Sequence, residues 1–534
     1  MSASERPWWT TAVYYQIYVR SFADSNGDGV GDLRGIIDRL DYLEWLGVDA
    51  IWLTPCFPSP NKDWGYDVTD YRDIHPDYGA LEDADDLIQR ASERGIRVLF
   101  DLVPNHTSDR HEWFKEARSN KSSPKRDYYV WRDPKPDGLL PNNWLSVFGG
   151  PAWELDEPSG KYYLHNFLHK QPDLDWWNDD VRREFDDIIR YWFDRGIAGF
   201  RIDVAHGIIK DRALRDNLPA TEDDEPVVQR IGQRATYSMN QPEVHEIHKK
   251  WRSISDEYAD PERVLIGETW VLELERMVEF YGTGEDELHL AFNFPFIYSS
   301  LDAGSMSQIV AETESRLPKA AWPAWTGSNH DVGRFPSRWA EGREDRIRVA
   351  MMVLLTLRGS PFLYYGDEIG MLDRHMEEDE LRDPVGITYW PDDAGRDRAR
   401  TPMQWSRGAG AGFTISDSPW LPLGDCTSTS VEDQRNRQDS MLNFTRSLIM
   451  LRKREIDLLE GAYEELESPS GVWVFKRGSS IVVAINLGNE GAAIPNLSGE
   501  VVAATSSGGS DELSDGRLRL GPGRGVVIKL ETTA

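Results

Sequence analysis

Two carboxylates stand at the ends of short apolar segments of this 534-residue chain. Asp203 lies near the end of segment 199–204, and Glu268 directly follows Val264–Gly267. Cleavage or transfer of a glycosidic bond needs one ionised carboxylate to attack the anomeric carbon and a second, protonated one to donate to the leaving oxygen. We therefore expect Asp203 to be a catalytic nucleophile and Glu268 a general acid/base.

An arginine accompanies the first carboxylate. Arg201 and Asp203 are two residues apart, so they project from the same side of an extended strand. We expect Arg201 to lower the pKa of Asp203 and keep it anionic, and neighbouring carboxylates to raise the pKa of Glu268. The alternative is a buried structural ion pair.

Polar residues follow two further apolar segments. Asp331 and His330 come after 325–327, and His106 comes after 98–103. The repetition at four segment ends favours a catalytic site over a structural ion pair. We expect Asp331 to bind sugar hydroxyls and raise the pKa of Glu268, and the histidines to hydrogen-bond hydroxyls in an oxocarbenium-like transition state.

The elements that would position these side chains are short apolar segments separated by amphipathic ones, as in parallel βα units. The expected strands are 13–19, 50–53, 98–103, 199–204, 264–267, 288–292, 325–327 and 361–365. The expected helices include 36–46, 84–94, 181–195, 242–259 and 346–357. This pattern predicts an α/β fold, a closed (β/α)8 TIM barrel that gathers its strand ends at one site.

Two regions depart from the repeat. Segment 105–172 is too long for one helix and its loops and is rich in Pro, Gly, Asn and Trp, which predicts a domain inserted after the third strand. Residues 1–104 and 173–458 would then form the barrel. In 459–534, segments that alternate like antiparallel strands predict a C-terminal β-sandwich.

Charge and cysteine content limit the partners. A formal net charge of −31 repels nucleic acid and anionic lipid, so we expect neither nucleic acid nor a membrane as partner and favour a small neutral substrate. Two cysteines are too few for a disulfide framework, and residues 1–10 lack the apolar core of a signal peptide. We expect a cytoplasmic protein, either monomer or homodimer.

Taken together, the motifs resemble glycoside hydrolase family 13, the α-amylase family. The resemblance covers nearly the whole chain and rests on DLVPNH (101–106), QPDLDW (171–176), GFRID (199–203), GE (267–268) and NHD (329–331). It implies a (β/α)8 barrel with an inserted domain B and a C-terminal β-sandwich. It also implies that Asp203, Glu268 and Asp331 form the catalytic triad.

Within that family the sequence looks like the α-glucosidase and oligo-1,6-glucosidase group. The residues that match those holding the terminal glucose are Tyr66, Asp67, His106, Gln171, Arg201 and His330. Arg400 matches an arginine that pairs with the aspartate corresponding to Asp67 and closes the pocket behind the non-reducing end. The resemblance thus implies an exo-acting, retaining α-glucosidase that releases glucose from maltose and short α-glucosides through a glucosyl-Asp203 intermediate.

The linkage and the acceptor stay open at this stage. Val204 after the nucleophile is typical of α-1,6-specific members, whereas 203–210 and 141–144 look like maltose-active enzymes. We expect a maltose-active enzyme, with an oligo-1,6-glucosidase, or a transferring or isomerising relative acting on sucrose or trehalose, as alternatives. Transglucosylation remains open, since any fitting acceptor can intercept the intermediate. A non-catalytic transporter subunit with this barrel is disfavoured because all three carboxylates are present.

Segment 24–32 resembles the first part of an EF-hand calcium loop but has Gly35 at the position of the bidentate Glu. The family resemblance implies one structural Ca²⁺ or Mg²⁺ held by Asp24, Asn26, Asp28 and Asp32 and the Val30 carbonyl. The alternative is a loop of Asx turns without metal. No organic cofactor is expected.

Overall fold

A computed structural model describes residues 6–506 and 512–531 of the chain. At its centre is an eight-stranded parallel sheet in the order β10-β11-β1-β2-β3-β7-β8-β9. A parallel bridge between Phe292 and Ala324 joins the two ends of the sheet and closes the barrel. The strands are β1 (Tyr14–Ile17), β2 (Ala50–Leu53), β3 (Arg97–Leu102), β7 (Gly199–Ile202), β8 (Val264–Gly267), β9 (Leu290–Ala291), β10 (Ala324–Thr326) and β11 (Ser360–Tyr364). All eight predicted strands are confirmed, with ends that differ by at most two residues.

The barrel strands are covered on both faces. Every residue of these strands except Arg97 is buried, which explains why they read as continuous apolar segments rather than as alternating ones. The outer layer includes α3 (Leu33–Asp38), α4 (Leu40–Leu46), α5 (Leu81–Glu93), α7 (Asp179–Asp194), α9 (Val244–Ser255), α12 (Ala303–Arg316), α14 (Glu344–Thr356) and α17 (Met441–Arg454). The predicted helix 36–46 is two helices, because the chain bends at Arg39 between α3 and α4.

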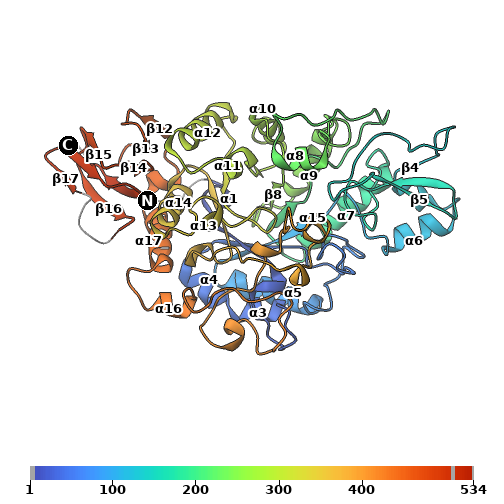
Figure 1. Cartoon of the computed structure of the whole chain (residues 1–534), viewed down its shortest axis with the longest axis horizontal. Coiled ribbons are helices and arrows are strands. Elements are labelled where there is room, and N and C mark those ends of the chain that lie inside the picture. The colour runs from blue at the N-terminus through green and yellow to red at the C-terminus, as the bar shows by residue number, and fades with distance from the viewer. Residues whose placement is uncertain (1–5, 507–511, 532–534) are drawn as a thin grey trace.

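The segment after β3 forms a small unit of its own. Its three-stranded antiparallel sheet has the order β4-β6-β5, and its helices are α6 and η1. The bounds are β4 (Trp131–Arg132), β5 (Trp153–Asp156), β6 (Lys161–Leu164), α6 (Glu112–Ser119) and η1 (Pro124–Tyr128). Trp144, Trp153 and Leu164 pack in its core. Figure 1 shows this unit at one end of the molecule and the C-terminal strands at the other.

Two other long connections follow β7 and β11. The first carries α8 (Pro226–Ile231), and the second carries α15 (Pro384–Tyr389) and α16 (Val431–Arg435). Both begin at the C-terminal ends of barrel strands, the face on which TIM barrels build their active sites. These two connections and the unit after β3 therefore shape the site.

The C-terminal strands form two antiparallel sheets, in the orders β12-β13-β14-β19-β16 and β15-β18-β17. Their bounds are β12 (Tyr463–Leu466), β13 (Val472–Arg477), β14 (Ile481–Asn486), β15 (Ala492–Pro495), β16 (Glu500–Ala504), β17 (Glu512–Ser514), β18 (Arg517–Leu520) and β19 (Arg524–Lys529). Val474 and Ile528 from one sheet pack against Ile494 and Leu518 from the other. The predicted β-sandwich is thus present.

In the parts of the chain that the structure describes, no helix combines the length and apolar character needed to cross a membrane. Residues 1–5, half of the segment examined for a signal peptide, lie outside the described residues.

Candidate active site

One guanidinium holds three carboxylates together at the ends of β3, β7 and β8. Arg201 Nη1 lies 2.9 Å from Asp101 Oδ1 and 2.7 Å from Asp203 Oδ1, and Arg201 Nη2 lies 2.9 Å from Glu268 Oε2. The Arg201 side chain is 1% exposed, that of Asp203 8% and that of Glu268 15%. The two expected catalytic carboxylates therefore share one buried cation and are close to each other, as their expected roles require.

Burial sets the ionisation of this cluster. It raises the pKa of Asp203 well above its usual value; Arg201 opposes the rise, while Glu268 and Asp101 add to it. Burial also raises the pKa of Asp101 to about 7. The expectation that Arg201 leaves Asp203 with a low pKa is therefore wrong in net direction. Three carboxylates thus face one guanidinium, so each of them disfavours the ionisation of its neighbours.

The backbone after Asp203 orients Glu268. The Val204 N–H donates to Glu268 Oε2 at 2.9 Å, and the Glu268 N–H donates to the Ile202 carbonyl at 2.9 Å. Val204 has φ of 46°, a strained conformation for a β-branched residue. In this conformation the Val204 N–H points toward the Glu268 carboxylate.

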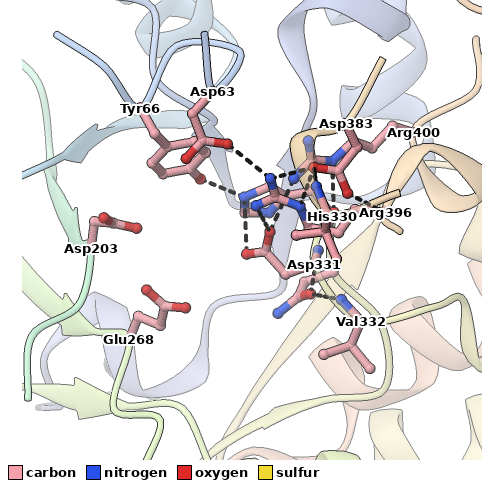
Figure 2. Close-up of polar contacts among 12 residues, drawn as sticks. Asp63, Tyr66, Asp203, Glu268, His330, Asp331, Val332, Asp383, Arg396 and Arg400 are labelled. Carbon is pink, nitrogen blue, oxygen red and sulfur yellow. Dashed lines mark hydrogen bonds and ion pairs between the residues drawn. The ribbon is translucent and has the colours of Figure 1, made fainter. Parts of the chain in front are cut away.

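Across the site, Tyr66, His330 and Asp331 form a second group of polar side chains that faces Asp203 and Glu268 (Figure 2). The His330 ring stacks on Tyr66 with centroids 5.4 Å apart, and Gln16 Nε2 donates to its Nδ1 at 2.7 Å. Burial lowers the His330 pKa well below its usual value, so the ring is neutral and carries its proton on Nε2. That nitrogen lies next to the Tyr66 hydroxyl and 3.2 Å from Asp331 Oδ2.

Two arginines hold Asp331. Arg396 Nη1 lies 3.2 Å and Arg400 Nη2 3.0 Å from Asp331 Oδ1. Burial acts to raise the pKa of Asp331, but the Nε2–H of the neutral His330 ring, 3.2 Å from Oδ2, and the guanidinium groups of Arg396 and Arg400 hold that pKa below the usual range. The Asp331 side chain is thus an anion in a fixed position, suited to accept hydrogen bonds from hydroxyls.

The expected pairing of Arg400 with Asp67 is wrong. Arg400 donates to the His330 carbonyl at 2.8 Å and to Asp331, whereas Asp67 accepts from the Ser59 hydroxyl and from the N–H groups of Lys62 and Asp63. Asp67 is fully buried, where it shapes the loop that presents Asp63. Three of the roughly four acceptor sites of the Asp67 carboxylate are thus used within its own loop.

An arginine–aspartate ion pair is formed instead by Asp63 and Arg396. Arg396 Nη2 lies 2.8 Å from Asp63 Oδ1 and 2.6 Å from Asp383 Oδ1. Both Asp63 and Arg396 line the cavity described below. Each stands four residues before the residue that we expected. The Asp383 contact had no signal in the sequence.

His106 and Gln171 lie beside this pair. Gln171 Nε2 donates to Asp63 Oδ2 at 3.0 Å and lies 3.0 Å from His106 Nε2, which is 3.1 Å from the Tyr66 carbonyl. Burial lowers the His106 pKa to about 4, so this ring is also neutral at neutral pH. The structure groups the predicted sugar-binding residues other than Asp67 around one recess, and of these Tyr66 and His106 line the cavity described below. Their binding of a sugar stays a prediction.

A cavity of about 270 Å³ lies in front of these groups. Asp203, Glu268 and Asp331 line it together with Asp63 and Arg396. Figure 2 shows Asp203 and Glu268 on neighbouring strand ends, directed toward the space before Asp331 and His330. A recess that two neighbouring carboxylates line can bind and cleave one sugar unit.

The loop 24–32 does not present a formed metal shell. Asp24 accepts from the N–H groups of Asn26, Gly27 and Gly29, and Asp28 accepts from that of Val30. Asp32 accepts from Ser25 and from the Gly35 N–H. Within the described ranges, no three Asp, Glu, His or Cys side chains are grouped to hold a metal ion. The oxygens are engaged as turn acceptors, and the cation stays a prediction.

Comparison with known proteins places the chain among sugar-cleaving enzymes. A model of the α-amylase catalytic domain matches residues 16–461. The chain is 40% identical over 506 residues to a probable α-glucosidase of Rhizobium meliloti, covering 91% of each chain. It is 39% identical over 522 residues to an oligo-1,6-glucosidase of Heyndrickxia coagulans, covering 90% of this chain and 92% of the relative. Among solved structures, an α-glucosyl transfer enzyme superposes with a TM-score of 0.92 at 38% identity, covering 99% of this chain and 100% of the other.

Proposed function

Because the chain belongs to the α-amylase family of glycoside hydrolases, family 13, we propose that it is an exo-acting, retaining α-glucosidase. The main support is that Asp203 and Glu268 both form ion pairs with the buried Arg201. Both carboxylates line a cavity that Asp63 and Arg396 also line. The chain is an enzyme of the glucosidase type, as its relatives are named.

The first step forms a glucosyl ester. An Asp203 carboxylate oxygen attacks the anomeric carbon while Glu268 gives its proton to the glycosidic oxygen, so the C–O bond to the leaving group breaks. In the second step Glu268 takes a proton from water, the water oxygen bonds to the anomeric carbon, and the Asp203 carboxylate leaves. The bridging of both carboxylates by Arg201 supports a short separation, and a short separation is typical of retaining enzymes.

The exo-action follows from the position of the ion pair between Asp63 and Arg396. Gln171 and Asp331 contact the same two residues, so the recess behind the first sugar is filled by side chains that can bind its hydroxyls. A glucan that continued past this point would have to displace a buried ion pair, which is costly. We therefore expect single glucose units to be released from the non-reducing end of maltose and short α-glucosides.

A second candidate is an oligo-1,6-glucosidase. It is supported by Val204 after the nucleophile and by relatives of that name at 36–39% identity. A transferring or isomerising enzyme is supported by the α-glucosyl transfer enzyme and by a trehalulose synthase structure with a TM-score of 0.90 at 33% identity.

One substrate panel tests these alternatives. Hydrolysis of p-nitrophenyl-α-glucoside, maltose, isomaltose, sucrose and trehalose is followed by NMR, which identifies the product and its first-formed anomer. We expect α-glucose from maltose and a loss of at least about 10⁴-fold in kcat for Asp203→Ala. Initial release of β-glucose would refute the retaining mechanism. An Asp203→Ala variant as active as the wild type would refute the assignment of the nucleophile.

A further inference from the structure

A second cavity, of about 420 Å³, lies between α4, α16 and the segment 405–412. All of its lining residues differ from those of the cavity that holds Asp203 and Glu268. In the view of Figure 1, α4 and α16 lie in the lower part of the molecule, whereas α8, which lines the active-site cavity, lies above them. Its volume is in the range of small-molecule sites, so the second cavity can be a binding site of its own.

Two guanidinium groups line this second cavity, those of Arg39 and Arg435. Arg39, at the bend between α3 and α4, lies over the Trp405 ring, 4.3 Å from its centroid, and donates to the Gly412 carbonyl at 3.0 Å. Arg435, on α16, lies over the Trp45 ring, 4.5 Å from its centroid. The aromatic rings and the carbonyl thus hold both cations at the wall of the cavity.

Neither of these cations has an acidic partner. In the part of the chain that the structure describes, no carboxylate forms an ion pair with Arg39 or Arg435, although the chain has 91 Asp and Glu residues for 60 Lys and Arg. Glu432 also lines the cavity, but its side chain is exposed and forms an ion pair with neither arginine. Burial lowers the pKa of Arg39, and Asp38 only partly opposes this. An anion bound in the cavity would supply the missing opposite charge.

We propose that this cavity binds a small phosphorylated metabolite, with the phosphate held by Arg39 and Arg435. Guanidinium groups match the oxygens of a phosphate, and its two negative charges match two arginines. A water molecule takes up about 30 Å³ in the liquid, so the cavity of about 420 Å³ has room for the organic part of a phosphate ester as well. The Ser406 hydroxyl and the Asn436 amide line the same cavity and can hydrogen-bond hydroxyls of that part. This site is separate from the proposed α-glucosidase site.

Isothermal titration calorimetry with ribose 5-phosphate tests the site. This sugar phosphate cannot form a pyranose ring, so it does not imitate the glucose of the active site. Arg39→Gln and Arg435→Gln are each expected to weaken its binding about ten-fold or more, because each removes a charged hydrogen-bond donor. Arg437→Gln is the matched control, since Arg437 is an exposed arginine two residues away that does not line the cavity. Its effect is expected to stay below about two-fold, because salt screens an exposed charge.

Arg435→Gln keeps the test valid if Arg39→Gln does not fold, because the Arg435 side chain is exposed. Thermal unfolding of each variant checks the fold without reference to activity. Failure of ribose 5-phosphate to bind the wild type, or an equal loss in all three variants, overturns the proposed site. Inorganic phosphate is titrated in parallel, and binding as tight as that of ribose 5-phosphate would overturn the assignment of an ester as the ligand. A chain without α-glucosidase activity that still binds ribose 5-phosphate through these arginines would overturn the proposed function alone.

Discussion

The ion pair between Asp63 and Arg396 can be measured with a double-mutant cycle. Its atoms Oδ1 and Nη2 are 2.8 Å apart, and the side chains are 4% and 14% exposed, so water screens the pair little. Arg396 also contacts Asp331 and Asp383, and its charge is shared among three carboxylates. We therefore expect a coupling free energy of about 2 kcal/mol between Asp63 and Arg396, which is roughly a 30-fold effect on kcat/KM.

The cycle compares wild type, Asp63→Asn, Arg396→Met and the double variant in hydrolysis of p-nitrophenyl-α-glucoside. Asparagine keeps an acceptor for Gln171 Nε2 while it removes the charge. Each single variant is expected to lose activity, and the double variant to lose about 30-fold less than the product of the two losses. Thermal unfolding of all four proteins checks that each is folded under the assay conditions.

The matched control is a cycle on Asp67→Asn and Arg400→Met. These side chains share no hydrogen-bond partner, so their coupling is expected to stay below about 0.5 kcal/mol. A coupling of about 2 kcal/mol between Asp67 and Arg400, or none between Asp63 and Arg396, would refute the assignment of the pair.

Three further predictions concern stability. Burial lowers the pKa of His248 to about 3, so the folded protein loses stability as the pH falls below 6.5, where the unfolded chain binds a proton more readily. His248→Gln is expected to remove about 3 kcal/mol of the stability loss between pH 6.5 and 4.5, measured by urea unfolding at each pH. An unchanged dependence of the unfolding free energy on pH would contradict this. Arg477 is fully buried and donates to the carbonyls of Thr356, Leu458 and Gly461. Arg477→Met is expected to lower the free energy of unfolding in urea by about 3 kcal/mol and to leave kcat/KM unchanged. A changed kcat/KM would contradict a purely structural role. The predicted cation should raise the unfolding temperature in calcium relative to EDTA, and Asp28→Asn should remove the difference; equal temperatures for the wild type would contradict the metal.

Much of the fold could be predicted from the sequence. A strand buried on both faces must be apolar throughout, so the barrel strands are visible as short apolar segments. Asp203 and Glu268 can be recognised in the sequence for the same reason. They are charged residues at the ends of segments whose other residues are apolar because they are buried. The bend at Arg39 was missed, because the apolar periodicity continues through it.

The sequence by itself therefore determined the barrel and which strand ends carry carboxylates, since both follow from local patterns. Only the tertiary structure decided that Arg396 pairs with Asp63 rather than Arg400 with Asp67, because the paired residues lie 333 positions apart and each motif offers more than one candidate. It also decided the net direction of the Asp203 pKa, since burial depends on everything packed around a side chain.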